Sequence, residues 1–376
     1  MIPFWIFISI ICLIYLFLIF SILIGWFRIK EFRGTDKQPV LFLSVVIPVR
    51  NEEANIHNLL NDLVSQEYPK EKFEVLIVDD HSDDDTYKLI KNFKSVHQIR
   101  ILQLPDEKSG KRAALIEGIT EAKSDLVLIT DGDCRLKKSW ISDMAGYYSS
   151  RSSKLIFGAV LHPASKKIGD MIQNLEFLSL VTSSAGLAGV NRPILCNAAN
   201  MGFERKLYLQ FANHVQTLTV SGDDVFFLHW VKQRYPDEIH FLKSRSSFVE
   251  TSYSKSATDF FNQRVRWTSK SRYYRDPSLI ITAIVVFVTS FLLMVLLVGA
   301  IFSKLLLQGF MIVFMVKCVA NFIFLYTTTS FYKTRYLLRI FIPVELLYFF
   351  YITITGIGGN LFAFTWKGRK SKPVLL

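Results

Sequence analysis

Residues 126–136 read LVLITDGDCRL, a run of apolar residues that ends in two aspartates, Asp131 and Asp133, one position apart. Because alternate side chains of an extended chain point to the same side, both carboxylates should face one point. Burying two like charges together is costly unless a cation or another positive group lies between them. This stretch therefore predicts a buried strand that ends at a site for something positively charged.

The segments before this stretch alternate between strand and helix patterns. Short β-branched runs at 44–49, 73–80 and 100–105 are typical of buried parallel strands, and a helical pattern follows each of them. This alternation indicates a doubly wound α/β sheet, in which ligands bind beyond the carboxyl ends of the strands. The acidic groups NEE, DDHS and DGD all lie at such ends. Three acidic groups on one edge favour a functional site over separate turns.

Long apolar segments lie at both ends of the chain. Residues 2–27 carry no charge and are long enough to cross a bilayer, and they lack the features of a cleaved signal peptide. We therefore interpret residues 1–30 as a permanent N-terminal anchor and residues 277–366 as a C-terminal transmembrane region of two to three helices. Lys317 and Glu345 are the charged residues inside these later segments, and we expect them to snorkel or to face neighbouring helices.

The net charge of +12 could suggest a nucleic-acid partner, but its placement argues against one. The basic residues crowd the flanks of the apolar segments, which is the orientation signal of cytoplasmic segments and also favours anionic lipids. We therefore expect no nucleic acid, a lipid bilayer as partner, and a cytoplasmic domain over residues 40–275 at a bacterial inner (plasma) membrane. Among the flanking residues, the sequence suggests membrane-facing charge for Arg264, Arg272 and Arg275.

The basic tail, residues 367–376, conflicts with a simple count of spans. Four full spans would put both chain ends on the outer side, whereas a basic tail favours the cytoplasm. Either the last segment, interrupted by GIGGN at 356–360, does not cross fully, or another span is miscounted. The four scattered cysteines form no disulfide pattern, which fits a reducing cytoplasmic domain.

Six short motifs follow one another along residues 40–275: VVIPVRNEE, IVDDHSDDDT, SGKRAALIEG, ITDGDC, GDD at 222–224 and QRVRW at 263–267. This ordered set resembles the motifs of the family 2 glycosyltransferases with the GT-A fold. The similarity is strongest to the membrane-embedded branch, which includes cellulose, chitin and hyaluronan synthases and the ceramide glucosyltransferases. The resemblance implies a Rossmann-like catalytic domain with a mostly parallel sheet, between N-terminal and C-terminal transmembrane helices.

The first motifs imply a site for a nucleotide-sugar donor, with uridine favoured as the nucleoside. By the resemblance, Glu52 and Asp80 should contact uracil or ribose, with Asp79 as the other candidate of its pair. Lys111 should lie near the base or the pyrophosphate.

The D-x-D motif implies a divalent cation. Mg²⁺ or Mn²⁺ prefers carboxylate and phosphate oxygens and can bridge the two. We expect Asp133 to ligate the metal, and Asp131 to contact it through water or to bind the ribose. Gly132 stands where the family usually has alanine, a small-for-small change that we expect to be harmless.

Sugar transfer with inversion needs one base that takes the proton from the acceptor hydroxyl. By the resemblance this base is Asp224, supported by Asp223. The alternative is a helix start, where aspartate satisfies free backbone amides. Residues 169–203 correspond to the interfacial helix and acceptor wall of the family, with Asn200 as a candidate acceptor contact.

The QRVRW motif lies just before the second apolar segment. Arg266 can pair with pyrophosphate oxygens, Trp267 offers an aromatic face to a sugar ring or acceptor, and Gln263 offers hydrogen bonds. The alternative is a basic interfacial helix with a tryptophan at the membrane surface.

The sequence as a whole favours a metal-dependent, inverting glycosyltransferase that acts on a membrane lipid or a lipid-linked acceptor. The runner-up is a subunit of a processive polysaccharide synthase. A nucleotidyltransferase would not need QRVRW beside a membrane. A transporter would need more helices and a repeated half. A non-catalytic scaffold would be expected to have lost acidic residues at the strand ends, whereas this sequence has all three acidic groups.

Overall fold

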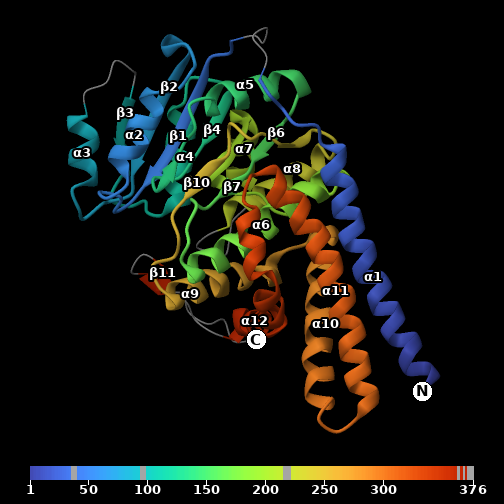
Figure 1. Ribbon diagram of the computed structural model, residues 1–376. Coiled ribbons are helices and arrows are strands. Elements are labelled where there is room, and N and C mark those ends of the chain that lie inside the picture. The colour runs from blue at the N-terminus through green and yellow to red at the C-terminus, as the bar shows by residue number, and fades with distance from the viewer. Residues whose placement is uncertain (35–39, 94–98, 215–221, 362–364, 367–368, 371–376) are drawn as a thin grey trace. The chain divides into compact units, whose positions relative to one another are not determined.

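The computed structural model describes residues 1–34, 40–93, 99–214, 222–361, 365–366 and 369–370 (Figure 1). The chain divides into two compact units. We call Met1–Trp26, Ala164–Gly186 and Tyr253–Leu376 the helical unit, and Phe27–Pro163 and Leu187–Ser252 the sheet unit. The domain boundaries expected from the sequence stay a prediction, because these units do not show where a bilayer begins.

The sheet unit is built on a seven-stranded sheet with the order β3-β2-β1-β4-β8-β6-β9. The first four strands of that order are parallel, and β8 runs antiparallel to both β4 and β6. The strands are β1 (Leu43–Val49), β2 (Phe73–Asp79), β3 (Ile99–Gln103), β4 (Leu126–Ile129), β6 (Leu155–Gly158), β8 (Met201–Glu204) and β9 (Ile239–Leu242). The mostly parallel α/β sheet predicted from the sequence is confirmed.

Helices cover this sheet because its central strands are apolar on both faces. Every residue of β1, β2 and β4 is buried. Gly118 lies in the helix Lys111–Glu121 and allows that helix to approach β1 and β2 closely, since an added Cβ would lie 2.5 Å from Val46 and 2.9 Å from Val78. The helices of the unit are α2 (Ile56–Val64), α3 (Thr86–Asn92), α4 (Lys111–Glu121), α5 (Trp140–Arg151), α7 (Arg205–His214) and α8 (Asp223–Arg234).

A small second sheet lies next to the D-G-D turn, with the order β5-β10-β7. Its strands are β5 (Cys134–Arg135), β10 (Val249–Thr251) and β7 (Val160–Leu161). Because β5 pairs with β10 through Cys134 and Thr251, the chain just after Asp133 is fixed by backbone hydrogen bonds. The four cysteines, all within the described residues, are free.

The helical unit contains α1 (Ile2–Arg28), α6 (Ile168–Ala188), α9 (Ala257–Thr268), α10 (Pro277–Gly299), α11 (Lys304–Phe331) and α12 (Phe341–Leu361). Among the described residues, four segments are long and apolar enough to cross a membrane: Ile2–Arg28, Pro277–Gly299, Lys304–Phe331 and Arg335–Gly358. Figure 1 shows α10 and α11 side by side as a hairpin. GIGGN does not interrupt α12; an added Cβ on Gly356 would lie 2.9 Å from the Phe287 ring of α10, so glycine permits close packing there.

The two charged residues of the apolar segments face neighbouring helices, one of the two arrangements expected. Lys317 of α11 pairs with Glu345 of α12, and both side chains are buried. Asn321 Nδ2 donates to Glu345 Oε1 at 2.7 Å, and Tyr15 OH donates to Asn321 Oδ1 at 2.7 Å. The first helix is therefore part of a hydrogen-bonded bundle and more than a separate anchor.

Candidate functional site

The acidic groups predicted from the sequence gather at one edge of the large sheet. They follow β1, β2 and β4, which are neighbours in the order β2-β1-β4 and run parallel. All three carboxyl ends therefore meet at the same edge, as expected of a doubly wound sheet.

The two aspartates after β2 have different surroundings. Asp79 is buried and accepts hydrogen bonds from the Ser82 backbone N–H at 3.2 Å and the Ser82 hydroxyl at 2.6 Å, so it holds the turn in which His81 has a φ of 54°. Asp80 Oδ1 accepts from the Gly110 N–H at 2.9 Å, just before α4. Asp80 thus connects the end of β2 to the start of α4, and the contacts of both residues with a nucleotide stay predictions.

Glu52 lies against the D-G-D turn. Its backbone N–H donates to Thr86 Oγ1 at 2.7 Å, which fixes the turn after β1. An added Cβ on Gly132 would lie 3.0 Å from Cγ of Glu52 and 3.0 Å from Cγ1 of Val49. An alanine at position 132 would therefore require these two side chains to shift by a few tenths of an ångström, and the expectation that glycine is a harmless replacement stays a prediction.

Lys111 is the positive partner of the paired aspartates in this structure. Its Nζ forms an ion pair with Asp131 Oδ1. Burial lowers the pKa of Lys111, but the charges of Asp131, Asp224 and Asp133 outweigh it and leave the pKa above its ordinary value. Asp133 Oδ2 accepts a hydrogen bond from the Thr251 hydroxyl of β10 at 3.3 Å. A protonated lysine thus lies among the acidic groups of two motifs.

The carboxylates at this edge suit a divalent cation that takes some of its ligands from the protein and the others from a substrate. Among the described residues no group of three or more His, Cys, Asp or Glu side chains could hold a metal by itself. Mg²⁺ sites in enzymes often use one or two protein carboxylates and take the remaining oxygens from substrate phosphates and water. Asp131 and Asp133 fit such a site, with Asp133 held in place by Thr251.

The GDD motif opens α8, as the alternative interpretation expected. Gly222, with a φ of 100°, precedes Asp223 and Asp224 in the first turn. Asp223 Oδ1 accepts from Arg112 Nη1 at 3.1 Å, and Asp224 Oδ2 accepts from the Ala198 N–H at 3.4 Å. A helix start and a reactive carboxylate are compatible, since Asp224 also contributes to the raised pKa of Lys111.

Arg112 is a residue of this edge that the motif analysis did not single out. It follows Lys111 in the first turn of α4, and its Nη2 also donates to the Ala212 carbonyl at 3.4 Å. Consecutive residues of one helix therefore hold the D-x-D motif and the GDD motif.

The QRVRW motif lies on α9 of the helical unit. Gln263 Oε1 accepts from Arg264 Nη1, and the guanidinium of Arg264 lies 4.3 Å from the centre of the Trp267 ring. Arg264 is only 4% exposed and forms an ion pair with Glu176. The expectation that Arg264 is membrane-facing charge was wrong, because a carboxylate 88 residues away in the chain neutralises it inside the unit. Arg266 is half-buried on the same helix.

Asn200 is completely buried in the sheet unit. Its Oδ1 accepts from Trp140 Nε1 at 2.9 Å, and its Nδ2 donates to the carbonyls of Ala159 at 2.9 Å and Ser247 at 3.3 Å. These bonds give it a structural role. Contact with an acceptor stays a prediction that would require the amide to leave these partners.

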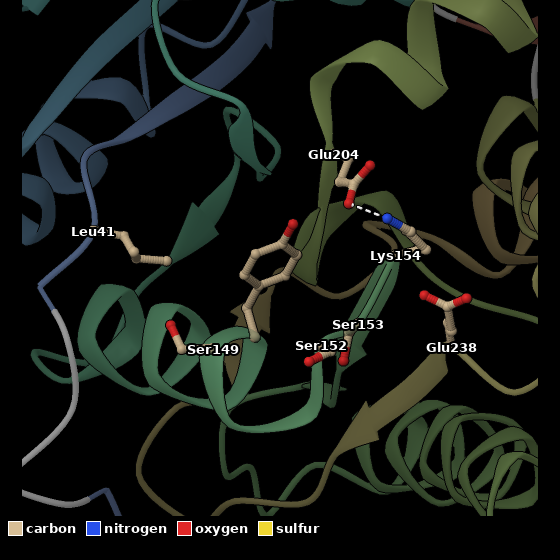
Figure 2. A pocket seen from close by; sticks show the side chains of 8 residues that line it. Leu41, Ser149, Ser152, Ser153, Lys154, Glu204 and Glu238 are labelled. Carbon is tan, nitrogen blue, oxygen red and sulfur yellow. Dashed lines mark hydrogen bonds and ion pairs between the residues drawn. The ribbon is translucent and has the colours of Figure 1, made fainter.

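A pocket of about 410 Å³ lies at the other edge of the large sheet. Lys154, just before β6, and Glu204, at the end of β8, form an ion pair at 2.5 Å beside it (Figure 2). Glu204 is in register with Leu126, the first residue of β4, whereas Asp131 follows the last residue of that strand. This pocket is therefore separate from the acidic edge.

Comparisons with known proteins identify the family of one part of the chain. Residues 44–198 match the family model described as glycosyl transferase family 2. Glycosyltransferase AglE of Haloferax volcanii is 29% identical over 198 residues, which are 51% of this chain and 60% of that protein. A dolichyl N-acetyl-alpha-D-glucosaminyl phosphate 3-beta-D-2,3-diacetamido-2,3-dideoxy-beta-D-glucuronosyltransferase of Methanococcus voltae is 24% identical over 58% of this chain and 69% of its own length.

A solved structure supports the same fold. A mannosyltransferase from Pyrobaculum calidifontis, in complex with GDP-Man and Mn²⁺, superposes with a TM-score of 0.56 at 14% identity, and the match covers 90% of this chain and 99% of that one. The fold of the sheet unit, the acidic edge and the family match agree with one another. The chain therefore carries a family 2 glycosyltransferase domain with a GT-A-like α/β fold.

Proposed function

We propose that this chain is an inverting, metal-dependent glycosyltransferase. It moves a sugar from a nucleotide-sugar donor, a UDP-sugar, to a membrane lipid or lipid-linked acceptor at the cytoplasmic face of a bacterial inner membrane. The main support is the convergence of Asp131, Lys111 and Asp224 at the carboxyl edge of a family 2 domain.

The donor's diphosphate would be held by the D-x-D turn and α4. Asp131 and Asp133 would hold Mg²⁺ or Mn²⁺, which when bound neutralises charge on the departing diphosphate. The mannosyltransferase of similar fold was solved with Mn²⁺ and a nucleotide sugar. Lys111 is a second positive group beside the same turn and would pair with phosphate oxygens. Glu52 and Asp80, with Asp79 behind them, line the neighbouring strand ends and would hold the nucleoside.

The acceptor would be deprotonated by Asp224. A general base must lie within hydrogen-bond reach of the proton that it takes. Asp224 lies in the first turn of α8, close enough to Lys111 to raise its pKa, so an acceptor hydroxyl between donor and α8 would meet this carboxylate. Asp223 would support it, since Arg112 fixes Asp223 to α4 at 3.1 Å.

A lipid-linked acceptor fits the rest of the chain. Four helices have the length and composition to cross a membrane, and basic residues flank them. The Methanococcus voltae relative is named for a dolichyl-phosphate-linked acceptor. Gln263, Arg266 and Trp267 on α9, together with the region 169–203, would meet the acceptor and the pyrophosphate.

The test is a transfer assay with purified full-length protein in lipid nanodiscs. A panel of nucleotide sugars is offered with membrane lipid extract and Mg²⁺ or Mn²⁺, and the products are analysed by mass. We expect one lipid that gains a single sugar, together with release of a nucleoside diphosphate. Release of pyrophosphate would instead indicate a nucleotidyltransferase, and a ladder of long products would indicate a polysaccharide synthase. No product with any donor would overturn the assignment, and full transfer by Asp224→Asn would overturn the role of Asp224 as the base.

A further inference from the structure

The buried arginine inside QRVRW has an unusual set of partners. Arg264 Nε donates to Glu176 Oε1 at 2.9 Å, and Nη2 bonds to Glu176 Oε2, so the guanidinium and the carboxylate form a bidentate pair. Glu176 belongs to α6, and both side chains are about 5% exposed. The pair therefore fixes α9 to α6 at one defined register.

The same guanidinium contacts two of the three motif residues directly. Nη1 donates to Gln263 Oε1, and the guanidinium carbon lies 4.3 Å from the centre of the Trp267 ring. Phe177, next to Glu176 on α6, packs against Trp267 with ring centres 6.2 Å apart. The orientations of the glutamine and the tryptophan thus depend on Arg264, the residue between them to which the sequence analysis gave no role at the site.

A third helix completes the arrangement. Tyr351 of α12 donates its hydroxyl proton to Glu176 Oε1 at 3.0 Å, and its ring lies 6.0 Å from that of Phe260 on α9. The carboxylate of Glu176 is thereby satisfied from two helices. A buried arginine needs this degree of pairing, because an unmatched charge in such a place is strongly destabilising.

We propose that Arg264 is a positioning residue for the QRVRW motif, set by Glu176. It does not touch substrate itself; it holds Gln263 and Trp267 in the orientation in which they meet the acceptor and the donor. The contact of Gln263 and Trp267 with substrate rests on the proposed function, but the positioning of α9 by Arg264 is testable without it. Lysine cannot replace the arginine, since an ammonium lacks the planar fork that reaches a carboxylate and an amide at once.

A charge swap separates positioning from simple stabilisation. In Arg264→Glu with Glu176→Arg the buried ion pair is restored, so we expect the thermal midpoint to recover relative to either single variant. The new glutamate cannot donate to Gln263 or stack on Trp267, so transfer should stay about 10- to 100-fold below wild type, mainly in kcat. Recovery of both stability and transfer would overturn the proposal.

A second measurement keeps the proposal testable if the swapped protein does not fold. Arg264→Lys should lower transfer, yet Arg264→Lys combined with Trp267→Ala should be no slower than Trp267→Ala alone. Additive losses would contradict positioning through Trp267.

The matched control is a second buried ion pair within the described part of the helical unit, Lys317 with Glu345. Lys317→Met with Glu345→Gln is expected to change stability without changing kcat or KM. If the wild type transfers no sugar, hydrogen exchange of residues 257–268 still decides the matter. Arg264→Lys should expose α9 to faster exchange, and unchanged exchange would overturn the positioning role independently of the proposed function.

Discussion

Replacing Asn200 by alanine tests whether this residue is structural or meets the acceptor. The change deletes three hydrogen bonds and leaves the Trp140 indole N–H and the Ser247 carbonyl oxygen without that partner, whereas the Ala159 carbonyl keeps its hydrogen bond from the Val249 N–H at 3.0 Å. A buried polar group that loses its partner costs about 1 to 3 kcal/mol. Taking the lower value for each of these two groups gives a loss of about 2 kcal/mol in the free energy of unfolding.

For a domain of this size such a loss lowers the thermal midpoint by about 4 to 8 °C. The midpoint is measured by scanning calorimetry on the full chain in nanodiscs, and transfer is measured on the folded protein at a temperature below both midpoints. We expect a large fall in the midpoint and an acceptor KM close to that of the wild type.

The matched control is Asn197→Ala, three residues earlier. The side-chain Oδ1 of Asn197 accepts a local hydrogen bond from the Ala199 N–H at 2.9 Å, and the residue is partly exposed. Its loss should cost about 1 kcal/mol, as for other capping residues. If Asn200→Ala instead melted like the wild type and raised the acceptor KM, the structural reasoning would be refuted and Asn200 would belong to the acceptor site.

Three further predictions concern the sheet unit. Gly132→Ala would bring a Cβ to 3.0 Å from Cγ of Glu52, so we expect that side chain to move and the donor KM to rise, with a smaller effect on kcat; unchanged nucleotide binding by calorimetry would contradict this. Asp224→Asn should lower kcat by about 10²- to 10⁴-fold while nucleotide binding persists. Asp133→Ala should instead weaken metal-dependent nucleotide binding. Full activity of Asp224→Asn would disprove the assignment of Asp224 as the base. Burial lowers the pKa of His240 below its ordinary value of 6.5, so the unfolded chain binds more protons just below that pH. The thermal midpoint should therefore fall as the pH drops from about 7 to 5, and His240→Gln should reduce that slope.

The strands that carry the acidic edge were predictable because each signal is local. A buried parallel strand must be apolar on both faces, and the β-branched runs of β1, β2 and β4 show this directly. The aspartates that follow them needed no further information to be placed at one edge. The antiparallel β8 was not predictable in this way, because Met201–Glu204 (MGFE) is short and contains no β-branched residue.

The structural partners were not predictable because they are distant in the chain. A basic residue among other basic residues beside an apolar segment is naturally interpreted as membrane-facing charge. Nothing close to Arg264 in the sequence shows that Glu176 will neutralise it. The same holds for Asn200, whose partner Trp140 lies 60 residues away. Motif analysis identifies residues whose amino-acid type is required by the chemistry of the site. It misses residues such as Arg264 and Asn200, whose amino-acid type is required by a partner that is close in space but distant in the chain.

Arg112 shows which signal could have found such a residue. Lys111 and Arg112 occupy the first turn of α4, where the helix dipole disfavours positive charge. Two cations in that place indicate acidic groups close by, and both have them: Lys111 pairs with Asp131, and Arg112 with Asp223. Because consecutive helical side chains diverge, the two cations reach two separate motifs. One helix turn thus sets the D-x-D and GDD carboxylates relative to each other, although the two motifs are far apart in the chain. Charge that opposes the helix dipole is therefore evidence for a site even where no motif is matched.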